Sequence, residues 1–84
     1  MPFVYILRCV DGSLYTGAAR DLEARLAQHE SGKASRYTRA HLPIELVWST
    51  RVRTWRRALQ EEWRIKQMSR AQKLALAGLA EIPR

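Results

Sequence analysis

The alternation of apolar and polar positions at the start of the chain predicts a β-hairpin. Residues 3–9 and 13–17 are short runs rich in β-branched and aromatic side chains, which is typical of strands. Between them, Asp11-Gly12 is a dipeptide that favours a tight turn. The first two elements are therefore expected to be antiparallel strands.

The length of the hairpin loop decides which side chains share a face. A two-residue loop places Tyr5 and Tyr15 on opposite faces, because a shift of one residue turns every side chain over. A three-residue loop closed by Gly12 pairs Leu7 with Tyr15 and Tyr5 with Gly17. We favour this loop because a glycine stands where it needs a positive φ. Both tyrosines then share one face, and Gly17 is expected to leave open space over the Tyr5 ring for a substrate or water.

The polar positions after the hairpin predict a helix and then a loop. Asp21 is a suitable N-cap, and the helix is expected to run to about residue 29 or 30, where Ser31-Gly32 ends it. From 31 to 43 the chain has no clear period and carries several basic residues. We interpret this segment as a basic surface loop with room for one helical turn.

The remaining pattern predicts a third strand and two more helices. The strand spans 44 to about 50, and Thr54 caps a helix from 55 to about 68. Ser69 caps a last helix from 70 to about 78 or 79. The order β-β-α-β-α-α predicts an α+β fold in which helices flank a small, mainly antiparallel, three-stranded sheet.

Composition limits this architecture to one domain. The chain has 84 residues, of which 46% are hydrophobic, so we expect a single domain over 1–84 with one modest core. Cys9 is the only cysteine, which excludes an internal disulfide. The N-terminal residues resemble neither a secretory leader nor a membrane segment, so a cytoplasmic location is expected.

The charge balance indicates a polyanionic partner. Fifteen lysines and arginines against eight acidic residues give a net charge of +7. Most of the cations are arginines, which bind phosphate in a bidentate manner.

Two polar residues lie beside the apolar stripe of the first predicted helix. At 100° per residue, Arg25 and His29 fall on neighbouring turns next to Leu22 and Leu26. On this helix alone, the favoured interpretation is an arginine stem packed along the core edge and a histidine acting as a C-terminal helix cation. A functional role is the alternative.

The second predicted helix carries a carboxylate on its apolar side. With Leu59 at the centre, Trp63 and Glu62 fall toward the core, whereas Glu61 falls toward solvent. A covered carboxylate is costly unless it is paired or binds a cation. Glu62 is therefore either a cation ligand or the partner of Lys66 in an i,i+4 salt bridge.

In chain order, these elements resemble the GIY-YIG nuclease superfamily, in particular its short stand-alone bacterial members. The resemblance spans roughly residues 3 to 70 and rests on Phe3-Val4-Tyr5, on Tyr15-Thr16-Gly17, and on the residues that follow in the expected order and spacing, which are Arg25, His29 and Glu62.

The resemblance implies a catalytic site. Glu62 would be the single protein ligand of one divalent cation, Mg²⁺ or Mn²⁺, because a hydrated cation needs few carboxylates. Tyr15 would activate the attacking water or pass on its proton, and Arg25 would neutralise the phosphate. Tyr5 and His29 would complete the pocket by hydrogen bonding, with His29 as a candidate proton shuttle.

Two further features belong to the implied site. Gly17 would let the backbone approach the phosphate. Some repair-type members carry a lysine directly after this glycine, where this chain has Ala18, and the chain contains no asparagine to match the C-terminal one of some homing endonucleases. These departures concern the proton relay and the rate more than the fold.

The implied function is metal-dependent hydrolysis of DNA by an endo- or exonuclease in repair or processing. RNA is a second candidate substrate, and no membrane association is expected. The alternative is a non-catalytic or partner-dependent nucleic-acid-binding module of the same fold; a protein partner or homodimer is left open. The phosphate-tracking surface would be the basic loop, with Lys33, Arg36, Tyr37 and Arg39.

Aromatic residues could stack on bases at such a surface. Tyr37 is one candidate, with Trp48 and Trp55 as others. All three tryptophans, Trp63 included, are nevertheless expected to be core residues.

Overall fold

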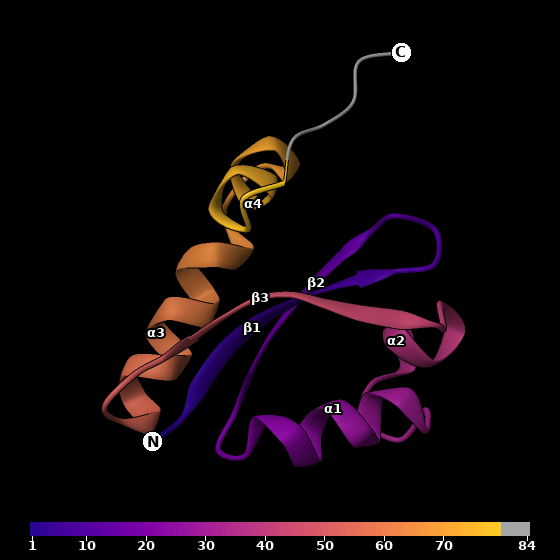
Figure 1. Cartoon of the computed structure of the whole chain (residues 1–84). Coiled ribbons are helices and arrows are strands. Elements are labelled where there is room, and N and C mark those ends of the chain that lie inside the picture. The colour runs from indigo at the N-terminus through magenta and orange to yellow at the C-terminus, as the bar shows by residue number, and fades with distance from the viewer. Residues whose placement is uncertain (80–84) are drawn as a thin grey trace.

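The computed structural model describes residues 1–79, so the last five residues of the expected domain lie outside the described part. Its elements are arranged as an α+β fold around one sheet (Figure 1). They are β1 (Phe3–Cys9), β2 (Leu14–Ala19), α1 (Leu22–Glu30), α2 (Arg36–Ala40), β3 (Ile44–Arg51), α3 (Trp55–Lys66) and α4 (Arg70–Leu76). The expected order is confirmed, with α2 as a short helix inside the expected basic loop.

The sheet is antiparallel, and β1 lies in its centre between β2 and β3. In the hairpin, Leu7 pairs with Tyr15 and Tyr5 with Gly17. Gly12 has a φ of 85°, as the three-residue loop requires. The predicted register is therefore confirmed, and the two tyrosines share a face.

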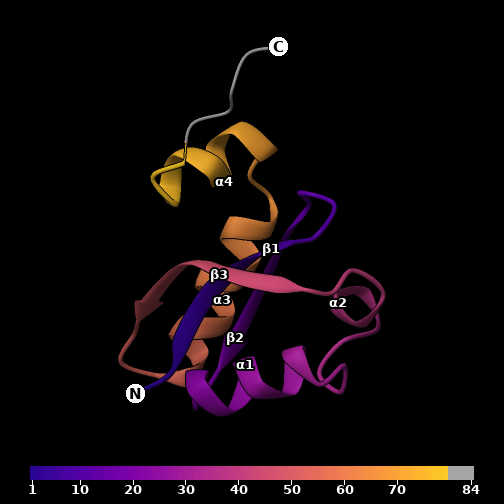
Figure 2. The same cartoon turned by 45° about the vertical axis from the view of Figure 1, so that its right-hand side comes forward.

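The two faces of the sheet bury different clusters. On one face, Val4 and Ile6 pack against α3 through Ala58 and Ile65. On the other, Tyr5, Leu7 and Ala19 form a second cluster that α1 covers with Leu22 and Leu26. Figure 2 shows α1 and α3 in separate layers of the fold. Since β2 is an outer strand of the sheet, side chains from both layers can meet around its edge.

The orientation of α3 differs from the prediction. Its buried residues are Ala58 and Ile65, whereas Leu59 is 46% exposed and Trp63 is 67% exposed. The prediction that Trp63 is a core residue is wrong. Ala58 presents only a methyl group, so the helix axis can approach β1 and β2 more closely than through the bulky Leu59 and Trp63.

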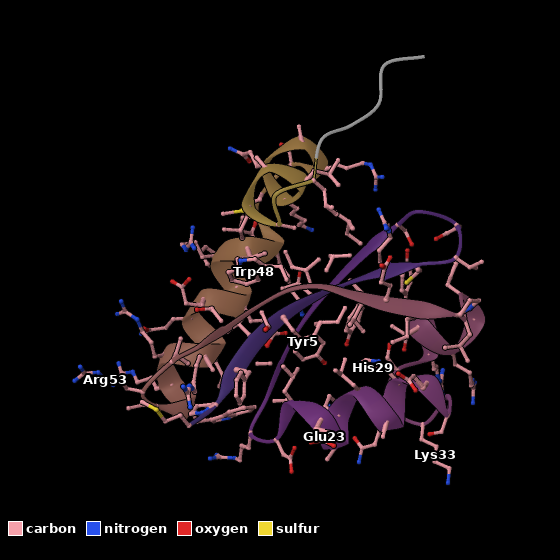
Figure 3. The ribbon with its side chains drawn as sticks, viewed as in Figure 1. Tyr5, Glu23, His29, Lys33, Trp48 and Arg53 are labelled. Atoms are coloured by element: carbon pink, nitrogen blue, oxygen red, sulfur yellow. The ribbon has the colours of Figure 1, made fainter. Side chains whose placement is uncertain are left out.

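The other two tryptophans pack against the core, as predicted. Trp48 and Trp55 both border the cluster around Ala58 and Ile65, and Figure 3 shows Trp48 on the α3 side of β3. The Arg20 guanidinium also lies over the Trp55 ring, 4.6 Å from its centroid. No helix in the part of the chain that the structure describes is long and apolar enough to cross a membrane.

The short helix α2 begins at a serine cap. The Ser35 hydroxyl accepts hydrogen bonds from the backbone N–H groups of Tyr37 at 3.1 Å and Thr38 at 3.5 Å. Thr38 is the one buried residue of the helix. The cap therefore fixes a helical turn that points a single threonine inward and leaves its basic residues exposed.

Candidate functional site

Tyr5 is at the centre of the site and is only 1% exposed. Its hydroxyl lies 2.8 Å from His29 Nε2. Figure 3 shows the two side chains between the sheet and α1. Burial is the main cause that raises the pKa of the Tyr5 phenol well above its ordinary value, with the nearby Tyr15 adding to it. Tyr5 is therefore a neutral phenol that can donate its proton.

Gly17 accommodates the Tyr5 ring. A Cβ atom at Gly17 would lie 2.5 Å from the Tyr5 hydroxyl oxygen and 2.6 Å from Cζ. The expectation of open space over the ring is therefore wrong, because the tyrosine itself occupies the room that the missing side chain leaves.

His29 is fully buried and links two elements. Its Nδ1 lies 2.8 Å from the hydroxyl oxygen of Thr38, which in turn donates to the Ser35 carbonyl at 3.3 Å. Since the Thr38 proton is used in that bond, Nδ1 carries the proton and donates it to Thr38. Nε2 is then an acceptor for the Tyr5 hydroxyl. The network assigns one tautomer to His29 and one direction to every hydrogen bond.

The protonation state of His29 follows from its surroundings. Burial lowers the pKa of His29, and the nearby Arg25 guanidinium lowers this pKa further. The imidazole is thus neutral near pH 7. The interpretation of His29 as a helix C-terminal cation is wrong, because the ring points inward to Tyr5 rather than to solvent.

Tyr15 lies against the same histidine. Its ring centroid is 5.3 Å from that of His29 in an edge-on arrangement. On α2, Tyr37 stacks with Tyr15 at 6.2 Å and with His41 at 4.4 Å. Within the described residues, the Tyr15 hydroxyl has no hydrogen-bond partner. It is therefore available to a water molecule or a substrate.

Arg25 supplies positive charge to this cluster. It is partly buried on α1, and in residues 1–79 no carboxylate lies within ion-pair distance of it. Besides its effect on His29, it opposes the rise in the pKa of Tyr5. A guanidinium with this effect on two neighbours lies close enough to stabilise an anion bound beside them.

Glu62 and Glu61 have similar environments. Their side chains are 20% and 23% exposed, so the prediction that Glu61 faces solvent is wrong. Glu62 forms the i,i+4 salt bridge with Lys66 that was one of its two predicted alternatives, at 2.6 Å, and Glu61 pairs with Arg64 at 2.8 Å. Glu62 differs in that its carboxylate contributes to the raised pKa of Tyr5. The negative charge of Glu62 therefore acts on Tyr5, although α3 lies in the other layer of the fold.

A hollow of about 380 Å³ lies along β2, and we call it the lysine hollow. Its lining residues come from β2, α2, α3 and α4, and they are Leu14, Tyr15, Thr16, Tyr37, Lys66 and Lys73. Lys66 both lines this hollow and forms the ion pair with Glu62. The Thr16 hydroxyl oxygen is buried and has no hydrogen-bond partner among residues 1–79. Tyr15, Tyr37 and the Glu62–Lys66 pair are thus brought around one concave surface.

The other basic residues of the expected phosphate-tracking surface lie elsewhere. Lys33, Arg36 and Arg39 are all exposed. Lys33 points away from Tyr5 and His29 in Figure 3, and the stem of Arg39 lies over Gly32. Only Tyr37 of this set lines the lysine hollow.

Sequence reasoning missed Thr38, Lys66 as a hollow residue, and Lys73. For Thr38 a signal existed, because Ser35 three residues earlier is a good N-cap and predicts a helical turn in the basic segment. Lys73 on α4 had no such signal, since its position depends on the angle between the last two helices.

The donor set suits a hard, hydrated cation. Residues 1–79 contain no cluster of three or more His, Cys, Asp or Glu side chains. Glu62 is a single, partly covered carboxylate next to a surface that can receive phosphate oxygens. Magnesium-type ions are held in this way, by one or two carboxylates with water and phosphate.

Comparison with known proteins matches this chain to a family. The GIY-YIG catalytic domain matches residues 1–75. UPF0213 protein SERP0126 of Staphylococcus epidermidis is 47% identical over 74 residues, which cover 88% of this chain and 90% of the relative. UPF0213 protein OB0043 of Oceanobacillus iheyensis is 48% identical over 79 residues, covering 94% and 92%.

A solved structure of another UPF0213 protein is similar to this chain. The NMR structure of UPF0213 protein BH0048 from Bacillus halodurans superposes with a TM-score of 0.60 at 39% identity, and covers 93% of this chain and 84% of that one. The match over most of the chain, together with the paired tyrosines on one face, shows that the protein belongs to the GIY-YIG catalytic domain family.

Proposed function

We propose that the protein is a nuclease that hydrolyses phosphodiester bonds of DNA with the help of one divalent cation. The observation that carries the proposal is the convergence of both tyrosines on His29. The ring centroids of Tyr5 and Tyr15 lie 5.7 and 5.3 Å from that of the histidine. Family membership supports a nucleic-acid substrate, and the net charge of +7 suits it.

The two tyrosines have different roles in this proposal. Tyr5 keeps its own proton, which it donates to His29 Nε2, so its oxygen can still accept a hydrogen bond. Tyr15 has a hydroxyl without a hydrogen-bond partner in residues 1–79; as its phenolate it would take a proton from the attacking water, and the phenol so formed would later release that proton to solvent. The neutral His29 accepts this hydrogen bond and so holds the Tyr5 hydroxyl in place beside the reacting atoms.

Arg25 and Glu62 complete the site. Arg25 would bind the phosphate whose negative charge grows in the transition state. Glu62 would hold Mg²⁺ or Mn²⁺, which supplies further charge neutralisation at the phosphate when bound. Glu62 also forms an ion pair with Lys66, which such a cation would have to displace.

A binding module without catalysis is the second candidate function. Two observations favour it: the Glu62 carboxylate is already paired, and Ala18 stands where some repair-type members carry a lysine. In that case the protein would bind DNA mainly through phosphate contacts, with steep salt dependence.

The experiment is a cleavage assay on labelled single-stranded, duplex and branched DNA and on RNA, with Mg²⁺, Mn²⁺ or EDTA. We expect cleavage that needs the cation and is abolished by Glu62→Gln and Arg25→Ala. Glu61→Gln is the matched control, because Glu61 is the adjacent carboxylate with nearly the same exposure and its own salt bridge. It should retain activity.

Two results would contradict the nuclease proposal. One is the absence of cleavage on every substrate and with every cation. The other is equal activity of the Glu62→Gln and Glu61→Gln variants. If cleavage is absent but Glu62→Gln still binds DNA with the wild-type salt dependence, the binding module is the correct function.

A further inference from the structure

Lys66 connects two parts of the site. Its ammonium group lies 2.6 Å from Glu62 Oε2, and its side chain also lines the lysine hollow beside Tyr15. The lysine side chain is 49% exposed, while that of its glutamate partner is 20% exposed. The partner that can move is therefore the lysine, whose long stem has four rotatable bonds and a compact charge.

The lysine hollow has the chemistry of a phosphate site. Lys66 and Lys73 contribute two positive charges, and no carboxylate is among its lining residues. Tyr15 and Tyr37 supply aromatic faces next to these charges, and Tyr37 as a residue is 42% exposed. A phosphodiester group with its attached nucleoside fits such a combination of cations and aromatic rings.

A divalent cation at Glu62 and the Lys66 ammonium group compete for the same carboxylate. Both are positive, and Lys66 already contacts one of the two carboxylate oxygens. We propose that Lys66 is an exchangeable counter-ion: it neutralises Glu62 while no cation is bound and, when a cation displaces it, turns into the lysine hollow to bind the phosphate next to the scissile one. The inference rests on the proposed function, because it takes Glu62 as the cation ligand.

This exchange has a measurable cost for cation binding. An exposed i,i+4 ion pair is weak, so its loss reduces cation affinity by only about two- to five-fold. Removing the lysine should therefore raise the cation affinity by the same factor, about two- to five-fold. The same removal should weaken nucleic-acid binding, but only when a cation has freed the lysine from Glu62. One side chain thus has opposite effects on two ligands.

The first measurement is a titration of the protein with Mn²⁺ alone, followed by the paramagnetic broadening of amide NMR signals around Glu62. We expect Lys66→Met to bind Mn²⁺ about two- to five-fold more tightly than the wild type. Arg64→Met is the matched control, since it removes the same charge from the same helix and breaks the Glu61 pair instead. It should leave the Mn²⁺ affinity unchanged.

The second measurement is the salt dependence of binding to a phosphorothioate single strand. Each lost phosphate contact lowers the slope of log affinity against log salt by about 0.7 on single strands. Lys66→Met should have the wild-type slope in EDTA and a slope lower by about this amount with Mn²⁺. Lys73→Met should lower the slope in both conditions, because Lys73 has no ion-pair partner in the described residues.

The outcomes separate this inference from the function it rests on. If Mn²⁺ broadens no signals around Glu62, or does so equally in Glu62→Gln, both the cation site and the exchange are wrong. If Mn²⁺ binds at Glu62 with the same affinity in wild type and Lys66→Met, only the exchange is wrong. A slope that Lys66→Met lowers equally in EDTA and Mn²⁺ would also overturn it, because the lysine would then be a permanent phosphate contact.

Discussion

The substitution Gly17→Ala tests what the glycine of the second motif does. The added Cβ atom would lie 2.5 Å from the Tyr5 hydroxyl oxygen and 2.6 Å from Cζ, whereas ordinary contact begins at 3.4 Å. The hydroxyl must therefore move by about 0.9 Å. A shift of this size is large against the 2.8 Å distance between this hydroxyl and His29 Nε2, so the substitution also disturbs that hydrogen bond.

The energetic cost has two parts. Overpacking a fully buried ring costs about 1–3 kcal/mol. Leaving the buried His29 nitrogen without its donor costs about 1–3 kcal/mol more. We therefore expect Gly17→Ala to lower the free energy of unfolding by about 2–6 kcal/mol. This is a large fraction of the 5–15 kcal/mol, roughly, that a domain has in total.

Urea denaturation followed by circular dichroism measures this cost. Gly78→Ala is the control, since Gly78 has a φ of 72° but nothing within 4 Å of an added Cβ atom. It should lose only the conformational cost of a left-handed alanine, about 1–2 kcal/mol. In a Tyr5→Leu background, which removes the ring, the cost of Gly17→Ala should fall to below about 1 kcal/mol.

Two outcomes would refute this reasoning. If Gly17→Ala is as stable as the wild type, Tyr5 does not need the space. If the costs of Gly17→Ala and Tyr5→Leu simply add, the two positions are not coupled. An alanine variant that folds normally yet no longer binds or cleaves DNA would instead support the interpretation that the glycine lets a phosphate approach the backbone.

Other predictions concern the network and the helix faces. Because the pKa of His29 is lowered in the folded state, the unfolded chain binds a proton below about pH 6.5 that the folded chain does not. The free energy of unfolding should therefore fall on acidification by up to about 1.4 kcal/mol per pH unit. The fall should be smaller in His29→Gln. A steeper loss in the variant would contradict this. Thr38→Val should cost about 1–3 kcal/mol in denaturant titrations, whereas Thr38→Ser, which keeps the hydroxyl, should be close to wild type; equal costs would disprove the hydrogen-bonding role. Trp63→Ala should change stability by less than about 0.5 kcal/mol, while Trp48→Ala should cost at least about 2 kcal/mol in the same titrations; the reverse order would mean that α3 is rotated.

The hairpin could be predicted from the sequence because its register depends on local features. Gly12 stands where a left-handed residue is needed, and the alternation of side chains then places Tyr5 and Tyr15 on one face. An extra residue does occur in β3, where the pairing shifts between Ile6 and Leu7, but it lies outside the hairpin. The two tyrosines therefore still lie on the same face of the sheet.

The face of α3 could not be predicted from its apolar residues. Leu59 and Trp63 are spaced like a buried stripe, yet the sheet packs against Ala58 and Ile65. Which side of an amphipathic helix is buried depends on how closely it can approach the sheet, and that is a property of both partners. The same limit applies to Glu61 and Glu62, which flank the buried side and are equally covered.

The role of Thr38 in α2 has a consequence for how this protein can vary. Thr38 is the one buried side chain of the helix, and it supports His29 from outside the sheet and α1. Arg36 and Arg39 on the same helix are exposed and take no part in that support. Mutation can therefore exchange the charged residues of this segment while the threonine preserves the network beneath. Surface charge and internal support are thus separable traits on a helix of five residues.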